Sequence, residues 1–193
     1  HIYRLFPDSY QVKHQFIISG LEGEIAGGKV NMIWDNKLKR LESDIKYNRD
    51  YTTINYWTSA GSKEDLSPRS SDREEETFTE AINWISFKQR FFTNGYVFNK
   101  PITTGYVSAE YDEQDTTVSK YCRAMIDLPL NHFTADAGEN TYYYGPNRIR
   151  ELKKVGVGFK ENLVLGWPVV RWINQFAIIP IFTFLEKYTG NYG

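Results

Sequence analysis

Much of the chain before residue 145 alternates between apolar and polar side chains with a period of two. Mostly apolar or aromatic side chains occupy every second position over 10–18, 30–34, 52–56 and 122–130. Alternation of this kind places one face of a strand in a core and the other face in water. The pattern therefore predicts a mainly β fold, in which these four segments are strands of antiparallel sheets.

Two segments between these strands have patterns of their own. Apolar residues crowd between Ala81 and Phe98, where Asn94-Gly95 tolerates the positive φ angles of a tight turn, so we expect a hairpin that turns at this dipeptide. The segment from Ser59 to Glu76 has almost no apolar side chains to offset the entropy that is lost on ordering. We expect this segment to be a mobile loop.

The pattern changes to a helical one after Tyr144. Gly145-Pro146 breaks the strand, Asn147 is a candidate N-cap, and Ile149 and Leu152 share one face of a short helix that Gly156 can end. This change divides the chain into a β-sandwich over residues 1–145 and a helical part over residues 146–193.

A second helix is predicted from Trp167 to about Tyr188. Its first half is amphipathic, and beyond Phe176 about ten residues are apolar on every side, which is too short to cross a bilayer. Pro180 is expected to kink or divide the helix. This pattern favours a helix at a membrane surface. The residues assigned to the membrane interface are Trp167, Arg171, Trp172, Ile173, Phe176 and Phe184.

Composition narrows the class of protein. The chain has 193 residues, of which 41% are hydrophobic, and its formal charge is −1, so no basic excess indicates a nucleic-acid partner. It begins at His1 without a signal segment, which suggests a processed chain or an excised piece. Cys122 is the single cysteine and excludes an internal disulfide. Its place on an apolar strand face predicts a buried, inert thiol.

Candidate chemistry is sparse. The histidines His1, His14 and His132 are scattered along the sequence, and His14 on its strand face is expected to be a hydrogen-bonded core residue. Asp112, Glu113 and Asp115 form an acidic cluster without the spacing of a helical calcium loop, which predicts an exposed turn. We therefore assign no catalytic, metal-binding or cofactor-binding residue, and we expect no enzymatic activity.

The aromatic side chains have two interpretations. The chain contains 12 Phe, 14 Tyr and 5 Trp, and rings of this kind can stack on sugars, as they do in carbohydrate-binding sandwiches. Alternatively, Trp34, Trp57 and Trp84 fill an aromatic core. A secreted carbohydrate-binding β-sandwich is therefore the alternative function that the sequence leaves open.

Two separated groups of motifs resemble the YidC family of bacterial membrane-protein insertases. The first group resembles the family's junction between the periplasmic domain and the second transmembrane helix, although Asn147 and Tyr192 stand where the family typically has Lys and Trp. It comprises Tyr144-Gly145-Pro146-Asn147-Arg148, Leu152-Lys153, Gly156-Val157-Gly158, Leu165-Gly166-Trp167 and Gly190-Asn191-Tyr192-Gly193. The second resembles a family strand and comprises Trp84-Ile85 and Lys88-Gln89-Arg90-Phe91-Phe92. The motif residues are Trp84, Gln89, Phe91, Phe92, Gly145, Pro146, Leu152, Gly190 and Asn191.

The resemblance implies a fold, a place and partners. It implies a β-supersandwich similar to the galactose-mutarotase scaffold, followed by a helical linker and an amphipathic helix. It implies a domain on the periplasmic side of the inner (plasma) membrane that helps to insert and fold membrane proteins as an insertase and chaperone. The implied partners are the membrane surface through the C-terminal helix, components of the Sec translocon, and nascent membrane proteins. No cofactor and no nucleic acid are implied.

Overall fold

The computed structural model describes residues 1–21, 23–163, 176, 178–182 and 184. The chain forms two compact units, residues 1–162 and residues 163–193. In the described part of the chain, no helix is both long enough and apolar enough to cross a membrane. The described residues of the second unit from 178 to 182 and Phe184 are helical, and they lie on both sides of Pro180.

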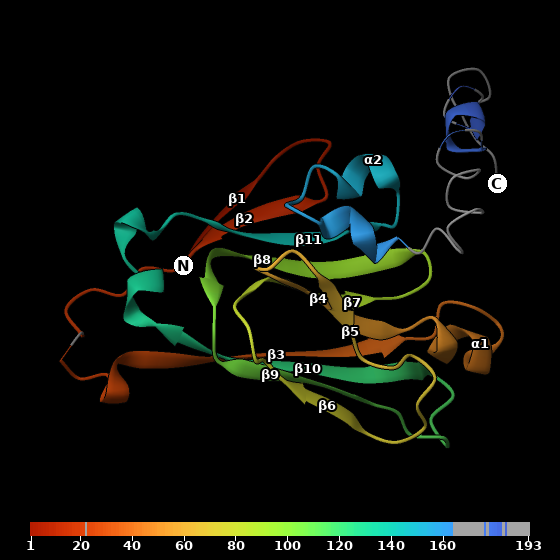
Figure 1. Ribbon diagram of the computed structural model, residues 1–193, viewed down its shortest axis with the longest axis horizontal. Helices are drawn as coiled ribbons and strands as arrows, with labels where there is room; N and C mark the ends of the chain where they lie inside the picture. Colours follow the sequence, from red (N-terminus) through yellow and green to blue (C-terminus); the bar gives the residue numbers. More distant parts are fainter. Residues whose placement is uncertain (22, 164–175, 177, 183, 185–193) are drawn as a thin grey trace. The chain divides into compact units, whose positions relative to one another are not determined.

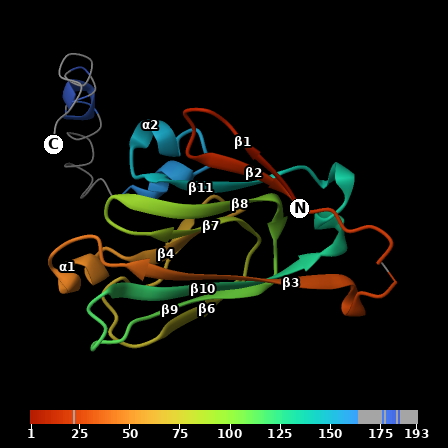
Figure 2. The same cartoon turned by 180° about the vertical axis from the view of Figure 1, so that it is seen from behind.

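The first unit is a sandwich of two antiparallel sheets, which confirms the predicted mainly β fold (Figures 1 and 2). The seven-stranded sheet has the order β1 (Ile2–Leu5), β2 (Gln11–Gln15), β11 (Asn140–Pro146), β8 (Phe92–Ile102), β7 (Ile82–Lys88), β4 (Thr53–Thr58) and β5 (Lys63–Asp65). The four-stranded sheet has the order β3 (Lys29–Lys39), β10 (Val118–Pro129), β9 (Gly105–Glu110) and β6 (Glu74–Thr77). The four segments with period-two patterns correspond to β2, β3, β4 and β10.

Short helices occupy the connections. They are α1 (Ile45–Asp50), α2 (Ile149–Leu152) and the 3₁₀ turns η1 (Ala26–Gly28), η2 (Leu130–His132), η3 (Ala135–Ala137) and η4 (Phe159–Asn162). Asp44 caps α1, because its side chain accepts a hydrogen bond of 3.0 Å from the backbone N–H of Tyr47. The helices of the sandwich unit are therefore local connectors rather than a layer of their own.

Aromatic and aliphatic side chains from both sheets form the core between them. The ring of Trp34 on β3 stacks on Phe87 of β7 at a centroid distance of 4.1 Å. On β10, the buried residues Cys122, Ala124 and Ile126 alternate with more exposed ones, as the sequence pattern predicts. These small and branched side chains are part of the core between the two sheets.

The predicted hairpin between Ala81 and Phe98 exists, but the prediction of its turn is wrong. The strands β7 and β8 are joined at Arg90 and Phe91, and the turn is closed by a hydrogen bond of 2.8 Å from the N–H of Gln89 to the carbonyl of Phe92. Asn94 and Gly95 lie inside β8. A glycine is needed there for space rather than for a turn, because a Cβ on Gly95 would lie 2.8 Å from Cε2 of Phe159 and overlap its ring.

The cap of the short helix after Tyr144 also differs from the prediction. Arg148, not Asn147, is the N-cap of α2, and no side chain caps it. The amide of Asn147 donates instead to the backbone carbonyls of Gln89, at 2.8 Å, and Arg90, at 3.1 Å. Asn147 therefore holds the end of β11 against the turn between β7 and β8. The helix ends at Leu152, well before Gly156.

The linker from residue 146 to residue 162 lies in the same compact unit as the sandwich. Phe159 is fully buried and contacts Trp84 edge-on at 4.9 Å. The side-chain oxygen of Asn162 accepts hydrogen bonds from the amide of Asn55, at 2.8 Å, and the hydroxyl of Ser86, at 2.6 Å. The linker is therefore fixed on the outer face of the seven-stranded sheet.

The polar segment from Ser59 to Glu76 contains two short edge strands. β5 pairs with β4, and β6 pairs with β9. Between these strands, residues 69–72 belong to no helix or strand, and their amides donate no backbone hydrogen bond among those described in the structure. Leu66 is buried and supplies the apolar anchor of the segment. The mobility of the segment stays a prediction.

We expect the substitution Gly95→Ala to lower the free energy of unfolding by about 1–3 kcal/mol, because the added methyl group overlaps the Phe159 ring. The matched control is Gly23→Ala, since nothing lies within 4 Å of a Cβ at Gly23. Urea unfolding of both variants measures the difference. Equal stability of the two variants would contradict the close approach of the linker to β8.

Hydrogen exchange tests the predicted mobility. We expect the amides of residues 69–72 to exchange fastest among the internal segments of the sandwich, because they lack backbone partners. The amides of β7 in the centre of the sheet serve as the internal reference. Protection of residues 69–72 comparable to that of β7 would show that the segment is ordered.

Candidate functional site

The two sheets of the sandwich have unequal widths, and this creates the candidate site. Trp34 of β3 contacts Phe87 of β7 and Tyr96 of β8, whereas Tyr56 of β4 contacts Phe78, which follows β6. The four-stranded sheet therefore covers the seven-stranded sheet from β8 to β4. The strands β11, β2 and β1 extend beyond the edge of β3 (Figures 1 and 2). We call the space between the edge of β3 and these three strands the side groove.

A cavity of about 310 Å³ lies in the side groove. Residues of β1, β2, β3, β8, β10, β11 and η2 line it, and the lining includes the rings of Tyr3, Phe16, Tyr96, Phe133 and Tyr142. None of the residues described along this cavity is Asp, Glu, Lys or Arg. Aromatic, apolar and neutral polar side chains therefore dominate the lining, together with the histidines.

All three histidines of the chain line this cavity, although the sequence suggested that they are scattered. His1 Nδ1 lies 3.0 Å from His14 Nε2, and His14 Nδ1 lies 3.3 Å from the hydroxyl of Tyr96. The prediction that His14 is a buried, hydrogen-bonded residue is confirmed. His132 enters from η2 with its Nδ1 atom buried and without a hydrogen-bond partner in the described structure.

Burial favours the neutral forms of His14 and His132. It lowers the pKa of His14 and of His132 below the ordinary value of about 6.5, so both imidazoles are uncharged near pH 7. Burial also raises the pKa of Tyr142 to about 12 and raises the pKa of Tyr96. The cavity can thus offer rings and hydrogen bonds to a ligand, but it offers no fixed charge from these groups.

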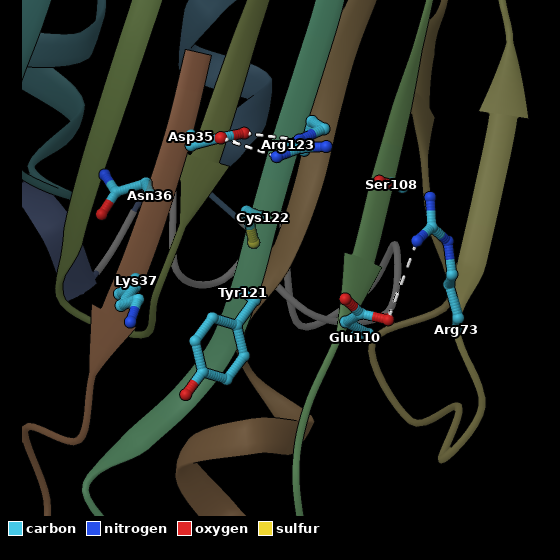
Figure 3. Close-up of a pocket in the computed structure, with 9 residues that line it drawn as sticks. All are labelled: Asp35, Asn36, Lys37, Arg73, Ser108, Glu110, Tyr121, Cys122 and Arg123. Atoms are coloured by element: carbon cyan, nitrogen blue, oxygen red, sulfur yellow. Dashed lines mark hydrogen bonds and ion pairs between the residues drawn. The ribbon is translucent and has the colours of Figure 1, made fainter. Parts of the chain in front are cut away.

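A second concave region lies on the outer face of the four-stranded sheet (Figure 3). Two hydrogen bonds of 2.7 and 2.8 Å join Arg123 to Asp35, and they lower the pKa of Asp35. Arg73 lies 3.9 Å from Glu110, and the ammonium group of Lys37 lies 5.3 Å from the centre of the Tyr121 ring. The two arginines are paired with carboxylates and Lys37 lies over an aromatic ring, an arrangement that is typical of a solvated surface.

The acidic cluster forms a turn, as predicted. Asp115 accepts hydrogen bonds from the N–H of Thr117, at 2.8 Å, and from the hydroxyl of Tyr121, at 3.0 Å. These and further hydrogen bonds, led by those from Thr117, lower the pKa of Asp115 to about 2. Asp112 accepts from the N–H of Gln114 at 2.9 Å. Within the part of the chain that the structure describes, no group of three His, Cys, Asp or Glu side chains is arranged to hold a metal ion.

The tryptophans are used for packing. Trp84 is fully buried, Trp34 stacks on Phe87, and a Cβ on Gly158 would meet the ring of Trp57. Trp84 is therefore buried as the core interpretation expects, whereas Trp34 and Trp57 are half-buried and pack against neighbouring residues.

The motif residues that the structure describes hold the linker and the ends of the strands. The indole N–H of Trp84 donates to the carbonyl of Val157 at 2.8 Å, and the amide of Gln89 donates to the carbonyl of Lys39 at 2.8 Å. The remaining motif residues have varied surroundings. Leu152 is fully buried, Gly145 lies against Tyr10 and Tyr143, the Pro146 carbonyl accepts from the hydroxyl of Tyr143, and Phe91 and Phe92 are exposed. Gly190 and Asn191 lie outside the described residues.

Most residues assigned to the membrane interface lie outside the described residues. These are Trp167, Arg171, Trp172 and Ile173. The other two, Phe176 and Phe184, are 63% and 59% exposed. Their assignment to a membrane stays a prediction. The side groove was missed at the sequence level because its residues come from segments far apart in the chain, and no local spacing signals them.

Comparisons with known proteins point to one family. The family model described as "YidC periplasmic domain" matches residues 1–180. A relative from Amoebophilus asiaticus, named "Membrane protein insertase YidC", is 35% identical over 193 residues, which cover 100% of this chain and 32% of the relative. Proteins of the same name from Parabacteroides distasonis and Cytophaga hutchinsonii are 30% and 28% identical, over 99% and 100% of this chain and 31% and 33% of the relatives. The chain thus spans about a third of the length of these curated relatives.

The reactivity of the Cys122 thiol tests whether the face of β10 that carries this residue is buried. Burial raises the pKa of Cys122 to about 12, so almost no thiolate is present near pH 8, and the side chain is 2% exposed. We expect a thiol reagent to label the folded chain at least about a hundredfold more slowly than the chain in denaturant. Equal labelling rates in the two conditions would show that this face of β10 is not buried.

Proposed function

The chain belongs to the family of YidC periplasmic domains, and from this membership we propose that it is the extracytoplasmic domain of a membrane-protein insertase. In this proposal it lies on the periplasmic side of the inner (plasma) membrane and takes part in inserting and folding membrane proteins. The observation that carries the proposal is the family match over residues 1–180, on a chain that forms the antiparallel sandwich expected for that domain. We propose no enzymatic step.

The physical task of an insertase is to lower the cost of moving polar groups across hydrocarbon, which is several kcal/mol for each unsatisfied group. We propose that the sandwich contributes indirectly. It docks partners, among them components of the Sec translocon, or it shields nascent membrane proteins as a chaperone, or it fixes the orientation of the C-terminal helix. The buried contacts of Phe159 and Asn162 support the last role, because the linker is fixed on the sheet up to the end of the first unit.

We propose that the segment from Trp167 to Tyr188 lies at the membrane surface. Its sequence places Trp172 and Phe176 on an apolar face and Arg171 on the opposite face, so the rings would enter the acyl region and the guanidinium would remain among headgroups or in water. Each large apolar side chain that is buried contributes about 1.5–3 kcal/mol before ordering costs. A few such residues give weak, reversible association.

Liposome flotation tests this proposal. We expect the double substitution Trp172→Asp and Phe176→Asp to abolish co-flotation of the chain with liposomes, because it places two carboxylates on the apolar face. The matched control is Asn174→Asp with Gln175→Glu, which adds the same charge to the polar face and should retain most of the binding. In the full-length protein, we expect the first pair to impair insertion more than the second pair does.

The thermal transition of the sandwich separates the membrane interpretation from simple packing. We expect the transition to stay nearly unchanged in both variants, since the substituted residues belong to the second unit. If the Trp172 and Phe176 substitutions unfold the sandwich while the unsubstituted chain never binds liposomes, the helix is part of the core and the proposed membrane contact is wrong.

A further inference from the structure

We propose that a polar cavity beside α1, at one end of the sandwich, binds a small zwitterionic ligand that carries a phosphate group and an ammonium group, such as phosphoethanolamine (Figure 1). We call this cavity the α1 pocket. The site goes beyond the proposed function, which requires no small ligand. Three features of the described structure carry the proposal: a fixed guanidinium group, unpaired charges of both signs around one cavity, and an excess of cations among them.

The α1 pocket has a volume of about 390 Å³, which is within the range of small-ligand sites. Residues of α1 form one wall, and the loops that follow β5 and β9 form the others. The charged residues that line it are Lys46, Arg49, Asp50, Arg69 and Glu113. The pocket is therefore built within the sandwich unit, from segments in the middle of the chain.

The guanidinium group of Arg49 is held in place by neutral groups. Its Nη2 atom donates to the backbone carbonyls of Asp112, at 2.7 Å, and Asp115, at 2.8 Å. Its central carbon lies 4.2 Å from the centre of the Tyr111 ring. Nε is buried without a hydrogen-bond partner in the described structure, and Nη1 forms no hydrogen bond there either. Carbonyl groups and a ring thus position a full positive charge without neutralising it.

The other charged side chains of the α1 pocket also have no partner of opposite sign. Within the described residues, no ion pair and no side-chain hydrogen bond joins this set to another group: Lys46, Asp50, Arg69 and Glu113. On the outer face of the four-stranded sheet, by contrast, Arg123 binds Asp35 directly (Figure 3). Charges of both signs that line one cavity without pairing are complementary to a ligand that carries both signs.

The excess of cations favours a phosphate group as the anionic part of the ligand. Lysine and arginine side chains outnumber carboxylates in the lining of the α1 pocket. A further amine lies beneath it, because Nζ of Lys120, which is 3% exposed, donates to the carbonyl of the lining residue Pro68 at 2.8 Å. The oxygens of a phosphate group can accept hydrogen bonds from several cations at once, and guanidinium groups match their geometry.

The two carboxylates of the α1 pocket restrict the ligand further. Asp50 and Glu113 repel an isolated phosphate ion, whereas an ammonium group on the same ligand gains attraction from them. In phosphoethanolamine a short ethylene linker separates the two charged groups, so both fit into a cavity of this size. The same chemistry occurs in the free compound and in the headgroup of phosphatidylethanolamine, and the experiments below distinguish these two sources.

Isothermal titration calorimetry on the complete chain tests the proposal. The titrants are phosphoethanolamine, inorganic phosphate and ethanolamine at equal ionic strength. We expect phosphoethanolamine to bind at least about fivefold more tightly than either of the other two, because only it satisfies both signs of charge. Hydrogen exchange gives a second readout. Phosphoethanolamine should slow the exchange of the amides of residues 69–72, since Arg69 and Ser70 line the pocket.

Two variants of the chain separate the two halves of the ligand. We expect Arg69→Gln to weaken the binding of phosphoethanolamine about five- to tenfold, because it removes a partner of the phosphate group. Glu113→Gln should weaken the binding of phosphoethanolamine but strengthen that of inorganic phosphate, an inversion that a loss of folding would not produce.

The matched control for these variants is Arg73→Gln. Arg73 is also exposed, but it pairs with Glu75 and Glu110 and does not line the α1 pocket. Its substitution should change the affinity for phosphoethanolamine by less than about twofold. Unchanged thermal transitions confirm that all three variants are folded.

Vesicles distinguish the two sources of the ligand. The probes are vesicles of phosphatidylcholine with and without phosphatidylethanolamine. If the pocket takes a lipid headgroup, vesicles with phosphatidylethanolamine slow the exchange of residues 69–72 in the unsubstituted chain but not in Arg69→Gln. If soluble phosphoethanolamine alone has this effect, the ligand is the free compound. Both results support the proposed site.

Several outcomes would overturn the proposal. Absence of binding would exclude the site, and equal affinities for phosphoethanolamine and inorganic phosphate would exclude a role for the carboxylates. Equal effects of Arg69→Gln and Arg73→Gln would place the ligand elsewhere. None of these outcomes depends on the flotation of the C-terminal helix, so failure here and failure of the proposed function remain distinguishable.

Discussion

The packing of a seven-stranded sheet on a four-stranded one is the constraint on which the rest of the structure depends. Apolar side chains of a sheet face are stable when a second layer covers them, and in the described part of the chain the second layer has β3 as its last strand. From β8 to β4 the two layers share a close-packed core that is centred on rings such as Trp34 and Phe87. Beyond β3, the same face continues without cover and becomes the side groove. In the described residues, this difference in strand number thus separates the close-packed core from the side groove.

In contrast to the side groove, the outer face of the seven-stranded sheet is contacted by the linker that follows β11. The linker places Phe159 over Gly95 and Asn162 over Ser86, so the segment that leads to the C-terminal unit is part of the sandwich. Two of the described motif residues serve this attachment: Trp84 binds the linker backbone, and Leu152, the last residue of α2, is fully buried. In this chain these side chains therefore have a structural role, which is to fix the path of the linker from β11 to residue 162.

The outer face of the four-stranded sheet and the side groove also differ in their charged side chains. The outer face of the four-stranded sheet carries exposed acids and bases that pair across β3 and β10, as Asp35 does with Arg123. Such pairs add little stability in water, but they keep the surface soluble and occupy its charges. The described lining of the side groove has no Asp, Glu, Lys or Arg, and its buried histidines are neutral.

The sequence alone determined the features that depend on local pattern. Period-two alternation identified β2, β3, β4 and β10 and the buried face that carries Cys122, because the side chains of a strand alternate between its two faces. The motifs around Trp84 and Gly145 identified the family. The tertiary structure decided the features that depend on contacts between distant parts of the chain. Asn94-Gly95 lies inside a strand because Phe159, 64 residues away, occupies the space beside Gly95. His1, His14 and His132 share a cavity because β11 brings β2 beside β8 while η2 lies at the end of β10. Contacts of this kind depend on the order of strands in a sheet, and that order is set by the burial of the whole core rather than by any single segment.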